Sequence, residues 1–267
     1  MTERPKICLS IAGLDPSGGA GVLADIKTFQ AFGCYGAAAV TSVTFQNTTG
    51  VFGAVHQTAD SVRQQVQPVI DDLGIDALKT GMLPTREVIE ETERLIRDND
   101  LMNFVVDPVV RSTSGYDLID GEAMRSLIEL LFPLADLITP NIPEAERITG
   151  IAIESEEDVV TAAELMREMG AQNVLIKGGH FQNSGSEKLA IDHLFLNDEV
   201  HKIAGTYHKT TSTHGTGCVL SAAIAANLAL GQSLLEAVTT SKQYVNEAIR
   251  TAPKIGHGHS PINIKTI

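Results

Sequence analysis

The sequence predicts an α/β protein built on a mostly parallel β-sheet with helices packed on both faces. Short, continuously apolar segments alternate with longer amphipathic segments along almost the whole chain, as strands and helices do in βαβ units. Most amphipathic segments end at glycine or begin at threonine or serine, as helices commonly do. One pair of neighbouring β-type segments, joined by Asn197 and Asp198, predicts a small hairpin in the C-terminal third.

The predicted strands are short and rich in valine, isoleucine and leucine, which is typical of strands buried on both faces. The third of them follows a turn at residues 47–50, and we expect it to form an edge of the sheet or a dimer contact. Strands are expected at residues 7–12, 37–46, 51–56, 77–80, 104–107, 136–139 and 174–177, with the hairpin at 190–196 and 199–203.

The predicted helices carry apolar residues three or four positions apart. Pro68 lies inside one of them and weakens that prediction. Helices are expected at residues 22–32, 58–73, 85–98 and 122–132, in a short segment opening at 140–144, from the cap Ser155 to Gly170, and in two C-terminal segments, the first at 219–230.

Composition narrows the class of protein. Hydrophobic residues make up 43% and charged residues 20% of the 267 positions, as in soluble globular domains. The net charge of −13 argues against a surface for nucleic acid or anionic membranes. Three cysteines without a C-x-x-C pair, no signal peptide and no membrane-length apolar stretch favour a cytoplasmic protein. Without linkers or repeats, residues 1–267 are expected to form a single domain.

Chemically informative residues follow the predicted strands. In an open parallel sheet the ligand crevice lies beyond the carboxyl ends of the strands, so residues at these positions are expected to share one site. The residues placed in this way are Gly13, Gln46, Gly81, Asp107, Asn141 and Lys177.

A glycine-rich segment at 210–218 runs directly into the apolar helix predicted at 219–230. Gly215 and Gly217 allow a tight turn that exposes backbone N–H groups at the positive end of the helix dipole, which predicts an anion site. Cys218 is either a small buried hydrophobe or, at this helix N-terminus, a thiolate able to deprotonate or orient an alcohol.

The strand-end residues complete the requirements of phosphoryl transfer. Asp107 can hold Mg²⁺ near phosphates, and Asn141 and Glu144 can reach that metal through water. Lys177 can place a positive charge on a triphosphate. Together with the anion site, these residues predict phosphoryl-transfer chemistry.

Four further features allow more than one interpretation. Asp25 either complements its helix dipole or lines the substrate pocket, and Gln46 is either a satisfied strand-end amide or a reader of a heteroaromatic edge. The Gly19-Ala20-Gly21 segment matches a dinucleotide pattern loosely but starts too far after its strand. The histidines show no metal-ligand spacing, and His180 is a possible ATP contact.

Several motifs resemble the ribokinase-like superfamily, specifically the hydroxymethylpyrimidine and phosphomethylpyrimidine kinases of thiamin biosynthesis, over essentially the whole chain. The motifs cover residues 12–21, 24–29, 46–48, 79–83, 139–145, 177–180 and 213–218. The resemblance implies a ribokinase-like three-layer sandwich and ATP- and Mg²⁺-dependent phosphorylation. The acceptors would be 4-amino-5-hydroxymethyl-2-methylpyrimidine and then its monophosphate. It also implies small-molecule ligands only, without nucleic acid or membrane, and we expect a homodimer.

The resemblance also assigns roles to residues. The pyrimidine pocket would contain Gly13, Ala20, Asp25, Gln46, Met82 and Val109. Asp107 and Glu144 would serve Mg²⁺, and Asn141 and Lys177 the nucleotide. The amides of Gly215, Thr216, Gly217 and Cys218 would bind the phosphoryl group, with Cys218 as the activating group. Thr113 stands where relatives often have a loop lysine, with Arg111 two residues earlier, and this departure bears on the second transfer.

Two alternatives stay open at this point. A pyridoxal or pyridoxine kinase is one, because some relatives with the same cysteine loop phosphorylate vitamin B6; the pair Gln46-Asn47 favours the aminopyrimidine. A nucleotide-binding protein without catalysis is the other, and the presence of Asp107, Lys177 and Cys218 argues against it.

Overall fold

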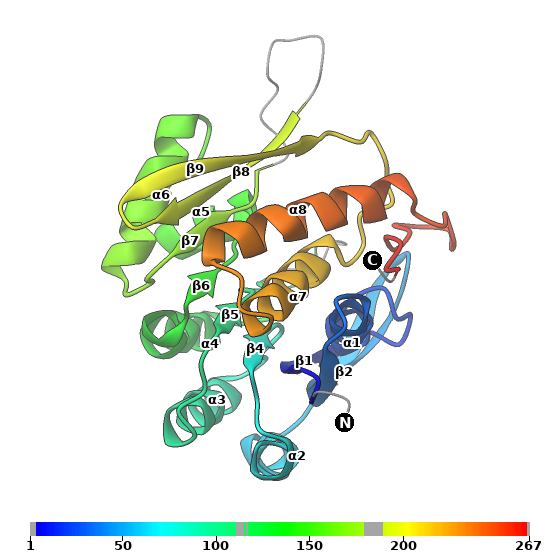
Figure 1. The fold of residues 1–267 in the computed structure, drawn as a ribbon, viewed down its shortest axis with the longest axis vertical. Coiled ribbons are helices and arrows are strands. Elements are labelled where there is room, and N and C mark those ends of the chain that lie inside the picture. Colours follow the sequence, from blue (N-terminus) through cyan, green and yellow to red (C-terminus); the bar gives the residue numbers. More distant parts are fainter. Residues whose placement is uncertain (1–3, 111–114, 116, 179–188, 266–267) are drawn as a thin grey trace.

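A nine-stranded sheet forms the centre of the molecule in a computed structural model that describes residues 4–110, 115, 117–178 and 189–265 (Figure 1). The strand order is β3-β2-β1-β4-β5-β6-β7-β8-β9. Strands β2, β1, β4, β5, β6 and β7 are parallel, whereas β3, β8 and β9 add antiparallel pairs at the two edges. The predicted fold class, a mostly parallel α/β sheet with one hairpin, is confirmed.

The strands agree closely with the predicted segments because each is a short apolar run between turn residues. The central strands are completely buried, as expected for a sheet covered on both faces. Their bounds are β1 Ile7–Leu14, β2 Tyr35–Asn47, β3 Gly50–His56, β4 Ala77–Thr80, β5 Phe104–Val106, β6 Leu137–Ile138, β7 Val174–Ile176, β8 Leu189–Leu196 and β9 Glu199–Thr206.

Two layers of helices cover the sheet, and each has its own hydrophobic core. Helices α1, α7 and α8 pack on one face, and α2 to α6 on the other (Figure 1). The bounds are α1 Gly21–Ala31, α2 Ala59–Leu73, α3 Arg86–Asp98, α4 Gly121–Ser126, α5 Ile142–Thr149, α6 Glu156–Glu168, α7 Thr216–Ala229 and α8 Leu234–Arg250. Helix α7 is buried nearly all round, as its small, mostly apolar residues and its lack of charged residues predict.

The helix expected at 122–132 differs from the prediction. After α4 the chain widens into a π-helical turn at Leu127–Leu131 and then tightens into a 3₁₀ turn at Phe132–Leu134. Pro133 lies in that last turn, and because it lacks an N–H group it cannot continue an α-helical hydrogen-bond pattern. Pro68, by contrast, is accommodated inside α2.

Strand β3 forms the sheet edge that the sequence predicted, pairing antiparallel with β2. Large apolar side chains on this pair are open to solvent, including Phe45, Phe52 and Val55. A dimer contact at this edge stays a prediction. None of the helices in the described part of the chain could span a membrane.

His193 on β8 gives a testable pH dependence of stability. It is buried, and neither ring nitrogen has a hydrogen-bond partner among the described residues. Burial lowers the pKa of His193, although Glu156, 3.9 Å away, opposes the shift. The unfolded chain therefore takes up a proton below about pH 6.5 that the folded chain does not, and the free energy of unfolding should fall there.

Urea unfolding between about pH 6.5 and 5.5 measures this effect, and His193→Phe should abolish it. His201→Phe, at a more exposed site on the neighbouring strand, is the matched control and should keep the wild-type pH dependence. An unchanged pH dependence in His193→Phe would contradict the assignment.

Candidate active site

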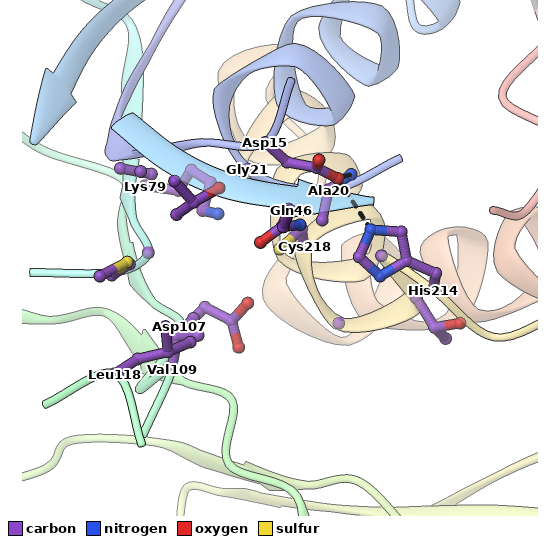
Figure 2. A pocket seen from close by; sticks show the side chains of 18 of the residues that line it. Asp15, Ala20, Gly21, Gln46, Lys79, Asp107, Val109, Leu118, His214 and Cys218 are labelled. Carbon is purple, nitrogen blue, oxygen red and sulfur yellow. Dashed lines mark hydrogen bonds and ion pairs between the residues drawn. The ribbon is translucent and has the colours of Figure 1, made fainter. Parts of the chain in front are cut away.

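A cleft of about 840 Å³, open to solvent, lies where the carboxyl ends of the central strands meet the N-terminus of α7 (Figure 2). The position is the one expected for an open parallel sheet. The predicted site residues that line it are Gly13, Ala20, Gln46, Met82, Asp107, Val109, Asn141, Glu144, Lys177, Gly215, Thr216, Gly217 and Cys218. The structure thus brings together every predicted site residue except Asp25.

Helix α7 begins with the backbone geometry that its glycines make possible. Gly215 is the N-cap residue, with φ of 80° in the left-handed region. A Cβ atom on it would lie 1.8 Å from the carbonyl oxygen of Gly19, so only glycine fits. The Thr216 amide donates to the Thr213 carbonyl, whereas those of Gly217 and Cys218 have no backbone acceptor in the described part of the chain. Two exposed amides therefore face the cleft where an anion would bind.

Cys218 is a neutral thiol in this environment. Burial raises the pKa of Cys218 to about 11, although the charge of Lys79 opposes the shift. Of the two interpretations that the sequence allowed, burial thus favours the thiol over the thiolate. Desolvation of the sulfur outweighs the helix N-terminus and the nearby cation.

Asp107 and Lys177 form an ion pair beside the start of α7, with Lys177 Nζ 3.0 Å from Asp107 Oδ1. Thr139 and Ser221 also donate to this carboxylate. Burial alone would raise the pKa of Asp107, but the two neighbouring lysines hold it below its usual range, so the group is ionised. A Cβ atom on Gly217 would lie 3.3 Å from Lys177 Nζ, which places the ammonium directly at the exposed amides.

Glu144 and Asn141 form a capping box at the start of α5. The Asn141 side chain accepts from the Glu144 amide at 2.9 Å, and Glu144 Oε2 accepts from the Asn141 amide at 2.8 Å. Burial raises the pKa of Glu144 to about 7; Lys177 opposes the shift and the charge of Asp107 adds to it. Glu144 thus has a structural task that the sequence analysis did not assign.

The carboxylates of Asp107 and Glu144 suit a hydrated cation held partly by a ligand. Both approach the same Lys177 ammonium, at 3.0 and 3.9 Å. No cluster of three or more His, Cys, Asp or Glu residues capable of holding a metal exists among the described residues. Two carboxylates, completed by water and ligand phosphates, are the usual arrangement for Mg²⁺.

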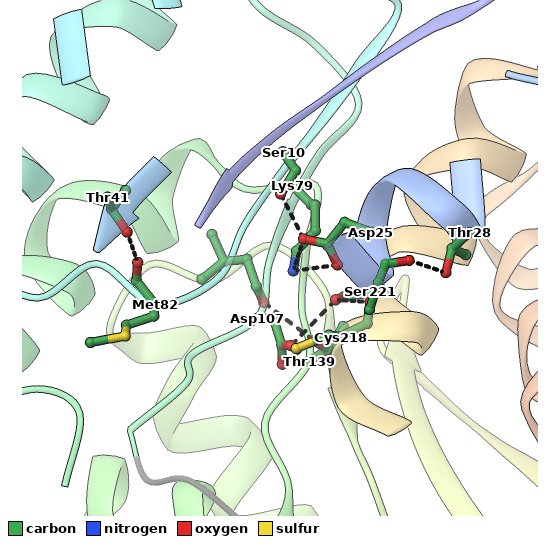
Figure 3. A network of polar contacts seen from close by, with 12 residues as sticks. Ser10, Asp25, Thr28, Thr41, Lys79, Met82, Asp107, Thr139, Cys218 and Ser221 are labelled. Atoms are coloured by element: carbon green, nitrogen blue, oxygen red, sulfur yellow. Dashed lines mark hydrogen bonds and ion pairs between the residues drawn. The ribbon is translucent and has the colours of Figure 1, made fainter. Parts of the chain in front are cut away.

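Asp25 does not line the cleft. Its carboxylate is completely buried beneath the floor, where it accepts hydrogen bonds from Ser10 at 2.6 Å and from Lys79 at 3.1 Å (Figure 3). A buried carboxylate needs such partners, and both oxygens are used by them. The expectation that Asp25 contacts a substrate is corrected accordingly.

Lys79 is a site residue that sequence reasoning missed. It contacts the cleft floor yet is completely buried, and the charge of Asp25 outweighs burial and raises its pKa. The sequence does contain a signal for this role, because a lysine within the apolar strand β4 requires a buried counter-ion. Asp15 and His214 also line the cleft, and His214 Nε2 lies 2.7 Å from Asp15 Oδ2. Both belong to the sequence motifs, but no role was predicted for them.

Some expectations concern residues that the structure does not describe. The loop containing Arg111 and Thr113, and the possible ATP contact His180, lie outside the described residues.

Comparison with known proteins gives a consistent likeness over nearly the whole chain. Residues 15–263 match the family described as phosphomethylpyrimidine kinase. The hydroxymethylpyrimidine/phosphomethylpyrimidine kinase of Bacillus subtilis (strain 168) is 44% identical over 255 residues, covering 96% of this chain and 93% of that protein. The solved phosphomethylpyrimidine kinase from Clostridium difficile 630 is 42% identical with a TM-score of 0.79, covering 91% of this chain and 99% of that one. The pyridoxal kinase from Staphylococcus aureus in complex with AMP-PCP and pyridoxal is 31% identical with a TM-score of 0.88, covering 98% of this chain and 94% of that one.

The buried pair of Lys79 and Asp25 gives a stability prediction. Lys79→Met leaves the Asp25 carboxylate buried and uncompensated, which should lower the free energy of unfolding by about 3–5 kcal/mol. Adding Asp25→Asn removes that charge and should restore most of the loss. Urea unfolding measures both. Arg86→Met, which breaks the exposed pair with Glu90, is the control and should cost less than about 1 kcal/mol. Equal losses in the single and double variants would contradict this account.

Proposed function

Because the chain belongs to the phosphomethylpyrimidine kinase family, we propose that it phosphorylates 4-amino-5-hydroxymethyl-2-methylpyrimidine with ATP. We further propose that its monophosphate is the acceptor of a second transfer, which gives the diphosphate. The observation that carries the proposal is one cleft that is lined by Gln46, by Lys177 and by the N-terminal residues of α7. An aromatic acceptor and a transferable phosphoryl group can meet there.

Each part of the cleft then has a task. The pyrimidine ring lies against Gly13, Ala20, Met82 and Val109, and the Gln46 amide supplies a donor and an acceptor to the edge of the ring. The side chains of these four residues are small or apolar, so a flat heteroaromatic ring can pack against them, and Gln46 meets its polar edge.

The phosphoryl side is electrostatic. Asn141 and Lys177 face the nucleotide, and the Gly217 and Cys218 amides bind the phosphoryl oxygens as the group passes. In the transfer, the bond from the γ-phosphorus to the bridging oxygen of ATP breaks. A bond from phosphorus to the acceptor oxygen forms, and the hydroxyl proton is released. The transition state is loose, so position and charge matter more than a strong base.

Cys218 suits that chemistry as a neutral group. A thiol with a pKa of about 11 is not a ready base at neutral pH. We assign it the role of orienting the acceptor oxygen. Asp107 and Glu144 would hold Mg²⁺, which when bound neutralises charge developing on the phosphates.

A second candidate acceptor is pyridoxal. The solved pyridoxal kinase from Staphylococcus aureus, bound to AMP-PCP and pyridoxal, shares the fold over 98% of this chain. Its ligand is also a flat heteroaromatic ring bearing a hydroxymethyl group. We therefore include B6 vitamers as alternative or additional substrates of the same cleft.

Two proposals concern the state of the protein. The exposed apolar side chains on β2 and β3, among them Phe45 and Phe52, support a homodimer formed at this sheet edge. The cysteines Cys8, Cys34 and Cys218 are all free, which favours a reducing, cytoplasmic location.

A direct assay tests the function. ADP release should be fastest with the aminopyrimidine alcohol, measurable with its monophosphate and slower with pyridoxal. Gln46→Leu removes both polar contacts to the ring edge and should raise KM for the pyrimidine about 10-fold or more, with a smaller change for ATP. Faster turnover of pyridoxal would favour the second candidate, and nucleotide binding without turnover of any acceptor would contradict both.

Variants of Cys218 test its role. Cys218→Ala removes the orienting group, and kcat should fall about 100-fold with little change in KM for ATP. Cys218→Ser keeps a hydroxyl that can bind the acceptor and should retain much more activity. Near-normal turnover of Cys218→Ala would remove its role, and equal inactivity of both variants would indicate a thiolate base instead.

A further inference from the structure

Asp15 and His214 connect two loops that lie far apart in the sequence. Asp15 follows β1 in the loop that carries Ala20 of the acceptor pocket, and His214 precedes the N-cap of α7. His214 Nε2 lies 2.7 Å from Asp15 Oδ2 (Figure 2). In the described part of the chain, this is the one hydrogen bond between side chains that joins the two loops.

The carboxylate of Asp15 is the organising centre of its own loop. It accepts hydrogen bonds from the Ser17 amide at 2.8 Å, the Ser17 hydroxyl at 2.8 Å and the Ala20 amide at 3.0 Å. Only 3% of Asp15 is exposed. A buried carboxylate with this many donors has a fixed position, so its partner His214 is held against a rigid element.

His214 is fixed from its other side by the C-terminal segment. Its amide donates to the Ser260 carbonyl at 3.2 Å, and its carbonyl accepts from the Ile262 amide at 3.4 Å. The backbone of His214 is therefore held by Ser260 and Ile262, and its imidazole by Asp15. Its side chain is 12% exposed and borders the cleft.

The backbones of the two loops touch at the same place. A Cβ atom on Gly215 would lie 1.8 Å from the Gly19 carbonyl oxygen, and one on Gly19 would lie 2.5 Å from His214 Cδ2. The pocket that holds Ala20 and the amides that bind the phosphoryl group are thus separated by one packed junction. Any loosening of this junction changes the distance between acceptor and phosphoryl group.

We propose that Asp15 and His214 are a positioning pair, which locks the acceptor loop to the phosphoryl-binding loop and sets the alignment of the two substrates. Neither residue exchanges a proton with a substrate in this role. Together with the Ser17 and Ala20 donors, His214 leaves neither oxygen of the buried Asp15 carboxylate unpaired. The inference rests on the proposed function, because alignment has meaning only for two substrates in this cleft.

Steady-state kinetics with both substrates test the proposal. His214→Ala should lower kcat about 30- to 100-fold, because a misplacement of about 1 Å costs up to about 100-fold, while KM for ATP changes less than about threefold. His214→Gln carries an amide nitrogen close to the Nε2 position and should recover about 10-fold over His214→Ala. His201→Gln, in an exposed pair with Glu199 outside the cleft, is the matched control and should keep wild-type kinetics.

A double-variant comparison separates positioning from an independent role. In an Asp15→Ala background, His214→Ala should change kcat by less than about threefold, because the two residues act as one unit. The proposal is overturned if His214→Ala has wild-type kcat or loses as much activity in the Asp15→Ala background as in wild type. It is also overturned if His214→Gln is no faster than His214→Ala.

Hydrogen exchange of the protein without ligands keeps this test independent of the substrate. His214→Ala should raise the exchange rate of the Ala20 amide about 10-fold or more, with helices α3 and α6 unchanged. If wild type phosphorylates none of the acceptors, the proposed function fails, and exchange at Ala20 alone decides whether the junction exists. Unchanged exchange overturns the inference, even where the enzyme is active.

Discussion

The architecture of the cleft depends on two largely buried ion pairs at the carboxyl ends of the parallel strands, where each charged side chain is neutralised by its partner. Lys79 pairs with Asp25 below the floor of the cleft, and Lys177 pairs with Asp107 beside the N-terminus of α7. Removing any one partner would leave an uncompensated charge in a desolvated place, which costs several kcal/mol. Replacing a whole pair by apolar groups would cost far less, so stability alone does not explain why these charges lie beside a ligand cleft.

The second constraint on the cleft is the close approach of two backbone segments, which only glycine allows. Gly215 meets Gly19 where a side chain would overlap a carbonyl oxygen, and Gly21 approaches the Gly13 carbonyl in the same way. The first contact brings the loop after β1 against the start of α7, and the second closes that loop on the end of β1. Short polar loops rich in glycine therefore form the site, while the large apolar residues form the sheet beneath it.

Sequence patterns predicted most of this organisation, and the failures share a physical cause. The strand ends were found because apolar runs stop there, so Gln46, Asp107 and Lys177 could be assigned to one crevice before any coordinates. Burial could not be read in the same way. Whether Asp25 faces a ligand or a buried lysine, and whether Cys218 is a thiol or a thiolate, depends on desolvation by residues distant in the sequence. The π-helical turn after α4 likewise has no periodic signal.

Lys177 bears on how so acidic a chain could bind the proposed polyanionic ligand. In this structure the ammonium lies between the carboxylates of Asp107 and Glu144, so an anion arriving alone would have to displace them. If the proposed phosphate ligand arrived with a divalent cation, Asp107 and Glu144 would hold the cation and Lys177 would be free to contact the phosphates. Binding of Mg²⁺ would also favour ionised Glu144, whose pKa of about 7 leaves it partly protonated at neutral pH. A net charge of −13 is compatible with the proposed nucleotide binding, because the ligand would meet the local charges of the cleft and its bound cation, not the net charge of the whole chain.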